Sequence, residues 1–177
     1  MNLSLVRFAG GPGSLGQWGT MFLTGASSAM IRTPYCEDID VPADVAEDRP
    51  GGIVVLNEAM GHLLFLPYRG EVMAGFALAQ CEELFPPVTL PRDEDPGLRI
   101  PTYRIIEGGG VVYLNERSLM RFGEDLLLIW RADEDFGRWE IDGVSHGEIV
   151  LVSLDERGRW EHQTWSLDHG WRIDVVR

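Results

Sequence analysis

The sequence predicts a mainly β fold, α+β at most, built from antiparallel hairpins and a C-terminal meander. Two observations indicate this class. Short apolar runs rich in β-branched residues recur along the chain, and Gly, Pro, Asn or Asp bounds each run. A sustained helical periodicity is nearly absent from the 177 residues. We expect a single domain over residues 1–177, long enough to bury about two thirds of its unfolded surface.

Eight apolar runs predict the main strands. They cover residues 3–8, 52–56, 63–66, 98–106, 111–114, 126–130, 148–154 and 160–167. From residue 138 onward the strands form a meander, because Asp and Gly supply the positive φ that tight connections need. The turns expected in this meander are 142–143, 155–158 and 168–170.

One short helix is expected over residues 77–84 (ALAQCEEL), which would end before the pair Pro86-Pro87. Two further segments are expected to form exposed loops. Residues 37–48 are acidic, and residues 85–97 are rich in both Pro and acidic side chains. The second segment is predicted to connect two halves of the chain.

An octapeptide occurs twice, as GGIVVLNE at 51–58 and as GGVVYLNE at 109–116, with six of eight positions identical. In both places a later Gly precedes an apolar run that ends in an aromatic residue and Arg, at 61–69 and 123–131. These similarities define pseudo-repeat units of about 51–85 and 109–141. An internal duplication explains them, and so does the convergence of two ordinary hairpins.

The formal net charge is −13, and all 15 cationic residues are Arg. The absence of Lys excludes Schiff-base chemistry and a phosphate-binding P-loop lysine. An acidic surface repels nucleic acid and attracts a basic protein partner. No apolar run is long enough for a membrane helix, and no secretory signal is visible, so a cytoplasmic protein with reduced Cys36 and Cys81 is expected.

The segment GGPGSLGQWG, residues 10–19, contains the pattern G-x-G-x-x-G of dinucleotide-binding turns. Such a turn must lead into a helix that faces the pyrophosphate. Gly19 and Gly25 interrupt the residues that follow, and Pro12 removes an N–H donor from the loop. The segment is therefore predicted to be a structural turn, and no nucleotide or other cofactor is expected.

Catalytic and metal-binding spacings are also missing. The four histidines do not form a ligand motif; they are His62, His146, His162 and His169. No serine lies in a nucleophile elbow. Carboxylates are so numerous that sequence cannot single out a pair. An enzyme with paired carboxylates in a β-sheet cleft therefore stays an alternative, and a structural β-module without a strong partner is a third reading.

Tryptophan and acidic residues point to protein binding. Trp160 and Trp165 are five residues apart in a predicted strand, so one of them is expected to face outward. The segment 129–139 places acidic residues between two tryptophans, a composition found in partner-binding surfaces. The predicted binding residues are Trp130, Asp133, Glu134, Asp135 and Trp139, together with Glu37 and Asp38 of the acidic loop. A solvated acidic hairpin loop is the competing interpretation.

Three segments of the chain form a pattern. They are Gly-Gly-Pro at 10–12 with Trp18-Gly19, GGIVVLNEAMGHLLFLP at 51–67, and EVMAGFALAQCEEL at 71–84. This pattern resembles immunity family 21 of bacterial polymorphic toxin systems. The resemblance covers residues 1–130 and does not extend past Gly137. It implies a cytoplasmic antitoxin that blocks a cognate toxin domain by steric occlusion, without catalytic residues. Many such toxins are basic nucleases, which suits an acidic inhibitor.

Overall fold

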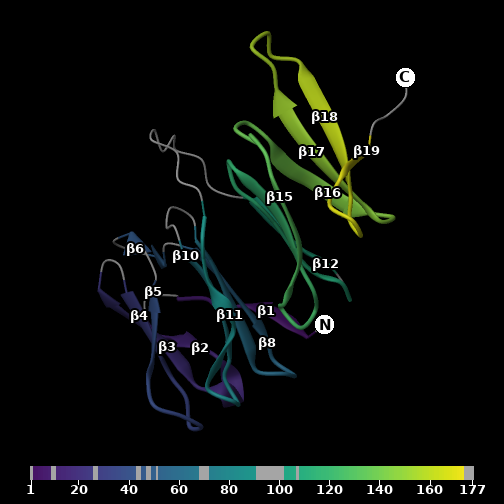
Figure 1. Ribbon diagram of the computed structural model, residues 1–177. Helices are drawn as coiled ribbons and strands as arrows, with labels where there is room; N and C mark the ends of the chain where they lie inside the picture. The colour runs from purple at the N-terminus through teal and green to yellow at the C-terminus, as the bar shows by residue number, and fades with distance from the viewer. Residues whose placement is uncertain are drawn as a thin grey trace. The chain divides into compact units, whose positions relative to one another are not determined.

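The computed structural model describes residues 2–8, 11–25, 28–42, 45–46, 49–50, 52–67, 72–90, 102–106 and 108–173. Across these residues the chain is antiparallel β-structure, and its helical content is the single-turn 3-10 helix η1 (Gly16–Trp18) (Figure 1). The mainly β prediction is confirmed. The chain divides into two compact units, Met1–Arg92 with Glu124–Leu127, and Asp93–Gly123 with Leu128–Arg177. We call them unit 1 and unit 2.

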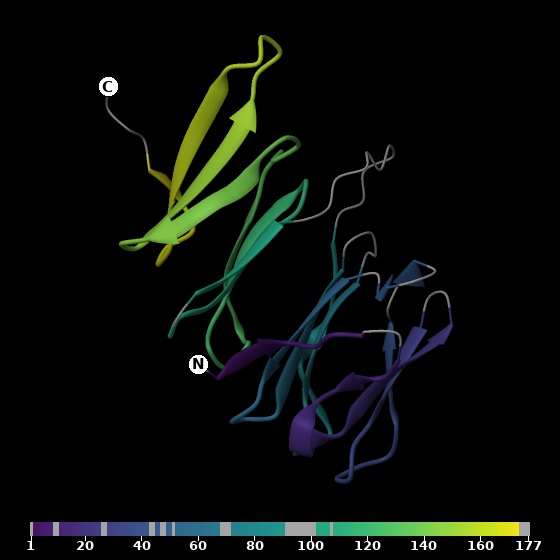
Figure 2. The same cartoon turned by 180° about the vertical axis from the view of Figure 1, so that it is seen from behind.

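Unit 1 contains a five-stranded sheet, a four-stranded sheet and a two-stranded hairpin (Figures 1 and 2). The strands of the five-stranded sheet follow one another in the order β1 (Leu3–Leu5), β8 (Gly52–Asn57), β9 (His62–Pro67), β10 (Val72–Ala77) and β11 (Glu82–Thr89). The strands of the four-stranded sheet follow one another in the order β2 (Gly13–Ser14), β3 (Thr20–Gly25), β4 (Ser28–Arg32) and β5 (Ile39–Pro42). The hairpin pairs β6 (Val45–Ala46) with β7 (Arg49–Pro50).

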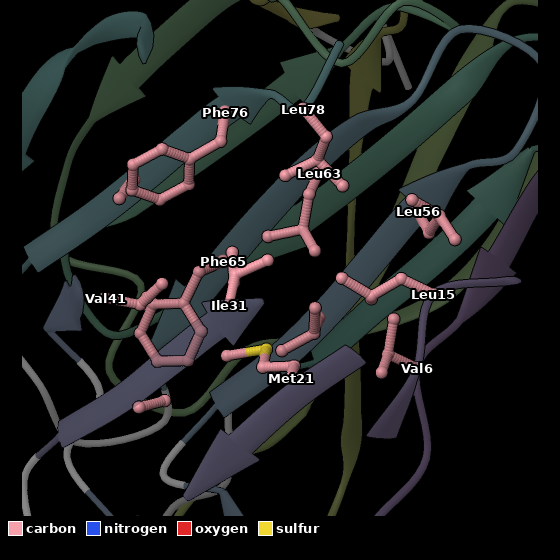
Figure 3. Close-up of a cluster of buried hydrophobic side chains, with 13 residues drawn as sticks. Val6, Leu15, Met21, Ile31, Val41, Leu56, Leu63, Phe65, Phe76 and Leu78 are labelled. Carbon is pink, nitrogen blue, oxygen red and sulfur yellow. The ribbon is translucent and has the colours of Figure 1, made fainter. Parts of the chain in front are cut away.

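The core of unit 1 lies between its two larger sheets. Leu56 and Phe65 of the five-stranded sheet pack in one buried cluster with Met21 and Ile31 of the four-stranded sheet (Figure 3). Every second residue of a strand points to the same face, so one face of each strand supplies this cluster. Burying each of these side chains stabilises the fold by about 1.5–3 kcal/mol.

Unit 2 contains two four-stranded sheets. The first sheet has the strand order β12 (Thr102–Ile106), β13 (Gly110–Leu114), β14 (Ser118–Phe122) and β15 (Leu128–Asp133). The second sheet has the strand order β16 (Glu140–Ser145), β17 (Glu148–Leu154), β18 (Trp160–Ser166) and β19 (Arg172–Ile173). The C-terminal meander is therefore present, and β17 has the predicted bounds.

The core of unit 2 is built around an aromatic pair. The rings of Phe136 and Trp165 lie 5.4 Å apart, and both side chains belong to a cluster with Val112 and Leu119. Trp165 is 1% exposed whereas Trp160 is 64% exposed. The prediction that the two tryptophans of β18 face opposite ways is confirmed.

The two sheets of unit 2 are also joined by polar bonds at one edge. The backbone N–H of Ile141 donates to Thr102 Oγ1 at 3.0 Å, and Arg104 Nη2 donates to the carbonyl of Ile141 at 2.8 Å. β16 lies at the edge of its sheet, so backbone groups on its open side need partners from outside the ladder. The turn predicted at 142–143 is wrong, because those residues lie inside β16 and the chain reverses at His146-Gly147.

The helix predicted over residues 77–84 is wrong. Ala77 ends β10, residues 78–81 form a turn, and Glu82 begins β11. The N–H of Leu78 bonds to the carbonyl of Gly61 at 2.9 Å, so a contact from another hairpin fixes this turn. An isolated eight-residue helix is too short to compete with such long-range pairing.

The two segments predicted as loops are partly strands. Residues 39–42 and 45–46 of the acidic segment form β5 and β6, and residues 85–89 of the second segment belong to β11. β11 lies at the edge of its sheet, where Pro86 and Pro87 are tolerated because ladder donors are not needed on the open side. Residues 43–44, 47–48 and 91–97 lie outside the described residues.

The repeated octapeptides form equivalent hairpin turns. Asn57 Oδ1 accepts the N–H groups of Ala59 and Met60, both at 3.0 Å. Asn115 Oδ1 accepts those of Arg117 and Ser118, at 2.9 and 2.7 Å. The first hairpin belongs to unit 1 and the second to unit 2. The sequence predicts one domain with two pseudo-repeats, and each compact unit contains one of these repeats.

The second part of the repeat was aligned wrongly by sequence. After the first octapeptide the chain enters β9, and after the second it enters β14. The counterpart of 62–67 is therefore 118–122, whereas the predicted counterpart, 123–131, runs into β15. Segments 61–69 and 123–131 resemble each other in apolar character, but the register of each hairpin decides which strands of the two repeats correspond.

Candidate functional site

The tryptophans predicted to bind a partner contribute to the core of unit 2. Trp130 and Trp139 are half-buried and pack against its hydrophobic cluster. The indole N–H of Trp130 donates to the carbonyl of Leu167 at 2.8 Å. Both side chains therefore have clear structural roles, and the large exposed indoles of this unit are those of Trp160 and Trp171.

Two of the three acids between those tryptophans form hydrogen bonds within the protein. Asp133 Oδ1 accepts from Ser118 Oγ and from Arg131 Nε, both at 2.6 Å. Burial opposes ionisation of Asp133, but the hydrogen bonds from Arg131 and Ser118 outweigh it and hold its pKa below the usual value. Asp135 accepts the N–H of Gly137 at 3.1 Å, and Glu134 is exposed.

The other two predicted residues belong to unit 1. Glu37 and Asp38 lie in the connection between β4 and β5, and both are exposed. Asp38 forms an exposed ion pair with Arg32 at 3.1 Å. The structure thus assigns the acids predicted to act together, at 37–38 and at 133–135, to different units.

Four connections of unit 1 converge on one another, and we call them the loop end. They are residues 15–19, 32–38, 58–61 and 78–82. Figures 1 and 2 show η1 beside the turns that join β8 to β9 and β10 to β11. The connections belong to four different hairpins and both larger sheets, so only the packing of the two sheets brings them together.

Trp18 is the centre of the loop end. Its indole N–H donates to the carbonyl of Glu58 at 2.8 Å, and its ring centroid lies 5.5 Å from that of Tyr35. Gly61 has a φ of +68°, and a Cβ there would lie 2.7 Å from the indole. Glycine is thus needed both for the backbone conformation and for the close approach of Trp18.

A disulfide between Cys36 and Cys81 joins two of the four connections. The Cα atoms are 5.9 Å apart, although 45 positions separate the residues in sequence. The prediction of two reduced thiols is therefore wrong for this structure. The sequence offered no spacing that indicates pairing, because strand packing brings the connections together.

The surface of the loop end combines exposed apolar groups with carboxylates. Tyr35 is 52% exposed and Met60 is 45% exposed. Four acids and one cation occur in its residues: Glu37, Asp38, Glu58, Glu82 and Arg32. The local formal charge is therefore −3, since four negative charges oppose one positive charge.

Part of this site is predictable from the sequence. Charge indicates Glu37 and Asp38, and the glycine-rich segment indicates Trp18. Tyr35 and Met60 were missed, because each is a single residue in a connection without a motif. A signal for them exists only in the convergence of the connections.

The described residues also bear on the chemical alternatives. A hollow of about 420 Å³ runs along β12 and is lined by Thr102, Tyr103, Arg104 and Ile105. None of these four described lining residues is a carboxylate. In the described part of the chain, no group of three or more His, Cys, Asp or Glu side chains is arranged to hold a metal ion.

None of the helices in the described ranges is long and apolar enough to span a membrane.

Comparison with known proteins yields no matching family model, no matching curated protein and no matching solved structure. The resemblance to an immunity family therefore stays a prediction.

Proposed function

We propose that this chain is a non-catalytic protein-binding module that acts in the cytoplasm as an immunity protein, neutralising a basic toxin domain by covering it. One observation carries the proposal. The loop end of unit 1 presents Tyr35 and Met60 on a surface with a formal charge of −3. Large apolar side chains framed by charge are the composition of a protein-binding surface.

The aromatic part of this surface is pre-organised. Trp18 is fixed by its hydrogen bond to Glu58 and by contact with Gly61, and it supports the ring of Tyr35 from the protein side. A tyrosine held in this way loses little conformational freedom on binding, so more of the contact energy contributes to affinity.

Charge selects the class of partner. The loop end and the whole chain are both acidic, and the single cation of the loop end, Arg32, already pairs with Asp38. A partner surface rich in Lys and Arg complements this arrangement, which favours rapid encounter and discourages acidic competitors.

The family resemblance supports the same surface. The segment at 10–19 contributes Trp18, and the segment at 51–67 contributes Glu58, Met60 and Gly61. The third segment, 71–84, contributes residues 78–82, so all three segments that resemble the immunity family supply residues to the loop end.

The test is a calorimetric titration with the protein encoded directly upstream of this chain, where a toxin paired with its immunity protein belongs. Replacing Tyr35 and Met60 together with Ala should weaken binding by about 10- to 1000-fold, since exposed aromatic anchors contribute about 1–4 kcal/mol. Leu23→Ala is the matched control, because Leu23 is also an exposed apolar residue of unit 1, on β3.

Two results would count against the proposal. If the wild-type chain does not bind the upstream protein, the immunity assignment fails. If Tyr35→Ala/Met60→Ala binds as the wild type does, while Glu134→Gln weakens binding, the acidic segment of unit 2 is the binding surface instead. Glu134 suits that comparison because Asp133 bonds to the side chains of Ser118 and Arg131, and Asp135 bonds to the backbone N–H of Gly137.

A further inference from the structure

We propose that Cys36–Cys81 is a reversible thiol-exchange site, that a small thiol attacks it at Cys81, and that the state of this bond sets the order of the loop end. The inference does not depend on a partner, so a failure of toxin binding leaves its test unaffected. It rests on the position of the two sulfurs and on the contacts of the connections that they join.

The two cysteines differ in accessibility. Cys81 is exposed and occupies the last position of the turn between β10 and β11, whereas Cys36 is half-buried in the connection between β4 and β5. Exchange needs an attacking thiolate to approach along the line of the bond, and access decides which sulfur it reaches. The geometry therefore favours attack on Cys81 with Cys36 as the leaving group.

The exchange is a two-step transfer of two electrons. A thiolate attacks Sγ of Cys81, a mixed disulfide forms there, and Cys36 leaves as a thiolate that takes a proton from water. A second thiolate then attacks the mixed disulfide and releases Cys81 with a small-molecule disulfide. Two small thiols are oxidised and the protein disulfide is reduced to two thiols.

The surroundings select the kind of thiol. Each cysteine is followed directly by an exposed glutamate, Glu37 after Cys36 and Glu82 after Cys81. These carboxylates repel an anionic thiol such as glutathione and attract a cationic one such as cysteamine. We therefore expect cysteamine to open the disulfide faster than glutathione at equal thiolate concentration, with the difference shrinking at high salt.

Apart from the disulfide, few contacts hold the connection at 33–38. Thr33 is buried, and its Oγ1 accepts the N–H of Tyr35 at 3.2 Å. Toward the surface, Tyr35 touches Trp18 and Asp38 pairs with Arg32, while the sulfurs of Cys36 and Cys81 lie beside the carbonyl oxygens of Leu78 and Tyr35. Exposed ion pairs contribute little to order. Opening the disulfide should therefore loosen residues 33–38 and 78–82, whereas the buried strands β8 and β9 stay protected.

The experiment uses the purified full chain with its disulfide formed. Limiting glutathione or cysteamine is added, free thiols are trapped with N-ethylmaleimide, and peptides are mapped by mass spectrometry. We expect the small thiol on Cys81 and the maleimide on Cys36. A mixed disulfide mainly on Cys36, or no opening by millimolar thiol under native conditions, would overturn the proposed exchange site.

Hydrogen–deuterium exchange tests the structural consequence. Full reduction should raise deuterium uptake several-fold in 33–38 and 78–82 without changing β8 and β9, and reoxidation should reverse it. The Cys36→Ser/Cys81→Ser variant should show the high uptake with or without thiol. The comparison of reduced and oxidised wild-type chain suffices if this variant does not fold, and equal uptake in the two states would contradict the switch.

Discussion

At the scale of single residues, many polar side chains hold backbone groups in turns. Asn57 and Asn115 each accept two N–H groups at the repeated hairpin turns. Asp133 accepts instead from two side chains, those of Ser118 on β14 and Arg131 on β15. Because a buried donor without a partner is costly, replacing such residues destabilises the fold more than the loss of one contact suggests.

The first prediction compares the two asparagines. Asn57 is buried and its Nδ2 also donates to the carbonyl of Glu124 at 2.6 Å, whereas Asn115 is half-buried. Asn57→Ala should lower the free energy of unfolding by about 2–3 kcal/mol and Asn115→Ala by about 1–2 kcal/mol. Urea denaturation measures both, and an equal or larger loss at Asn115 would contradict the role assigned to Asn57.

The second prediction concerns the pH dependence of stability. Because the folded state lowers the pKa of Asp133, this carboxylate stabilises the fold above its unfolded pKa of about 3.9 and the contribution disappears as the pH falls through the lowered value. The unfolding free energies of the wild type and Asp133→Asn should therefore approach one another progressively as the pH falls below about 4. A difference that stays constant from neutral pH to pH 2 would refute the assignment.

At the scale of elements, sequence pattern located strands better than turns. β17 and β18 were found because β-branched and aromatic residues fill them between clear turn residues. β3 and β4 were missed, since each has an apolar run of only three residues, 21–23 and 29–31, between polar or small residues. The turn at Asp142-Gly143 was misplaced because a residue pair common in hairpin turns occurs here inside a strand, beside a bulge.

The turn that joins β16 to β17 leads to the third prediction. His146 has a φ of +51° and Gly147 a φ of +79°, a conformation that Asn-Gly adopts more easily than His-Gly. His146→Asn should raise the free energy of unfolding by about 0.5–1 kcal/mol, and Gly147→Ala should lower it. Thermal denaturation distinguishes the two, and a loss of stability in His146→Asn would show that its side chain has another role.

At the scale of the whole molecule, charge is the dominant property. The chain has a net charge of −13 without a single Lys, and the loop end adds a local charge of −3 to exposed apolar groups. Long-range attraction affects the rate of encounter, whereas short-range packing affects dissociation. The proposed binding function therefore separates into two measurable parts.

The fourth prediction uses this separation. Association of the chain with the basic partner that we propose should slow markedly as ionic strength rises, while the dissociation rate changes little. Met60→Ala should raise the dissociation rate and leave the salt dependence of association unchanged. Stopped-flow kinetics at several salt concentrations measures both rates, and association that is insensitive to salt would contradict electrostatic steering.

The sequence by itself determined the fold class, the C-terminal meander, the opposite faces of Trp160 and Trp165, and the acidic character of the surface. These properties follow from alternation, turn residues and charge, all of which are local or additive along the chain. Tertiary structure alone decided that Cys36 meets Cys81 and that Tyr35 and Met60 lie with Trp18 in one loop end. Such convergence depends on how two sheets pack, because contacts between connections distant in sequence leave no local pattern.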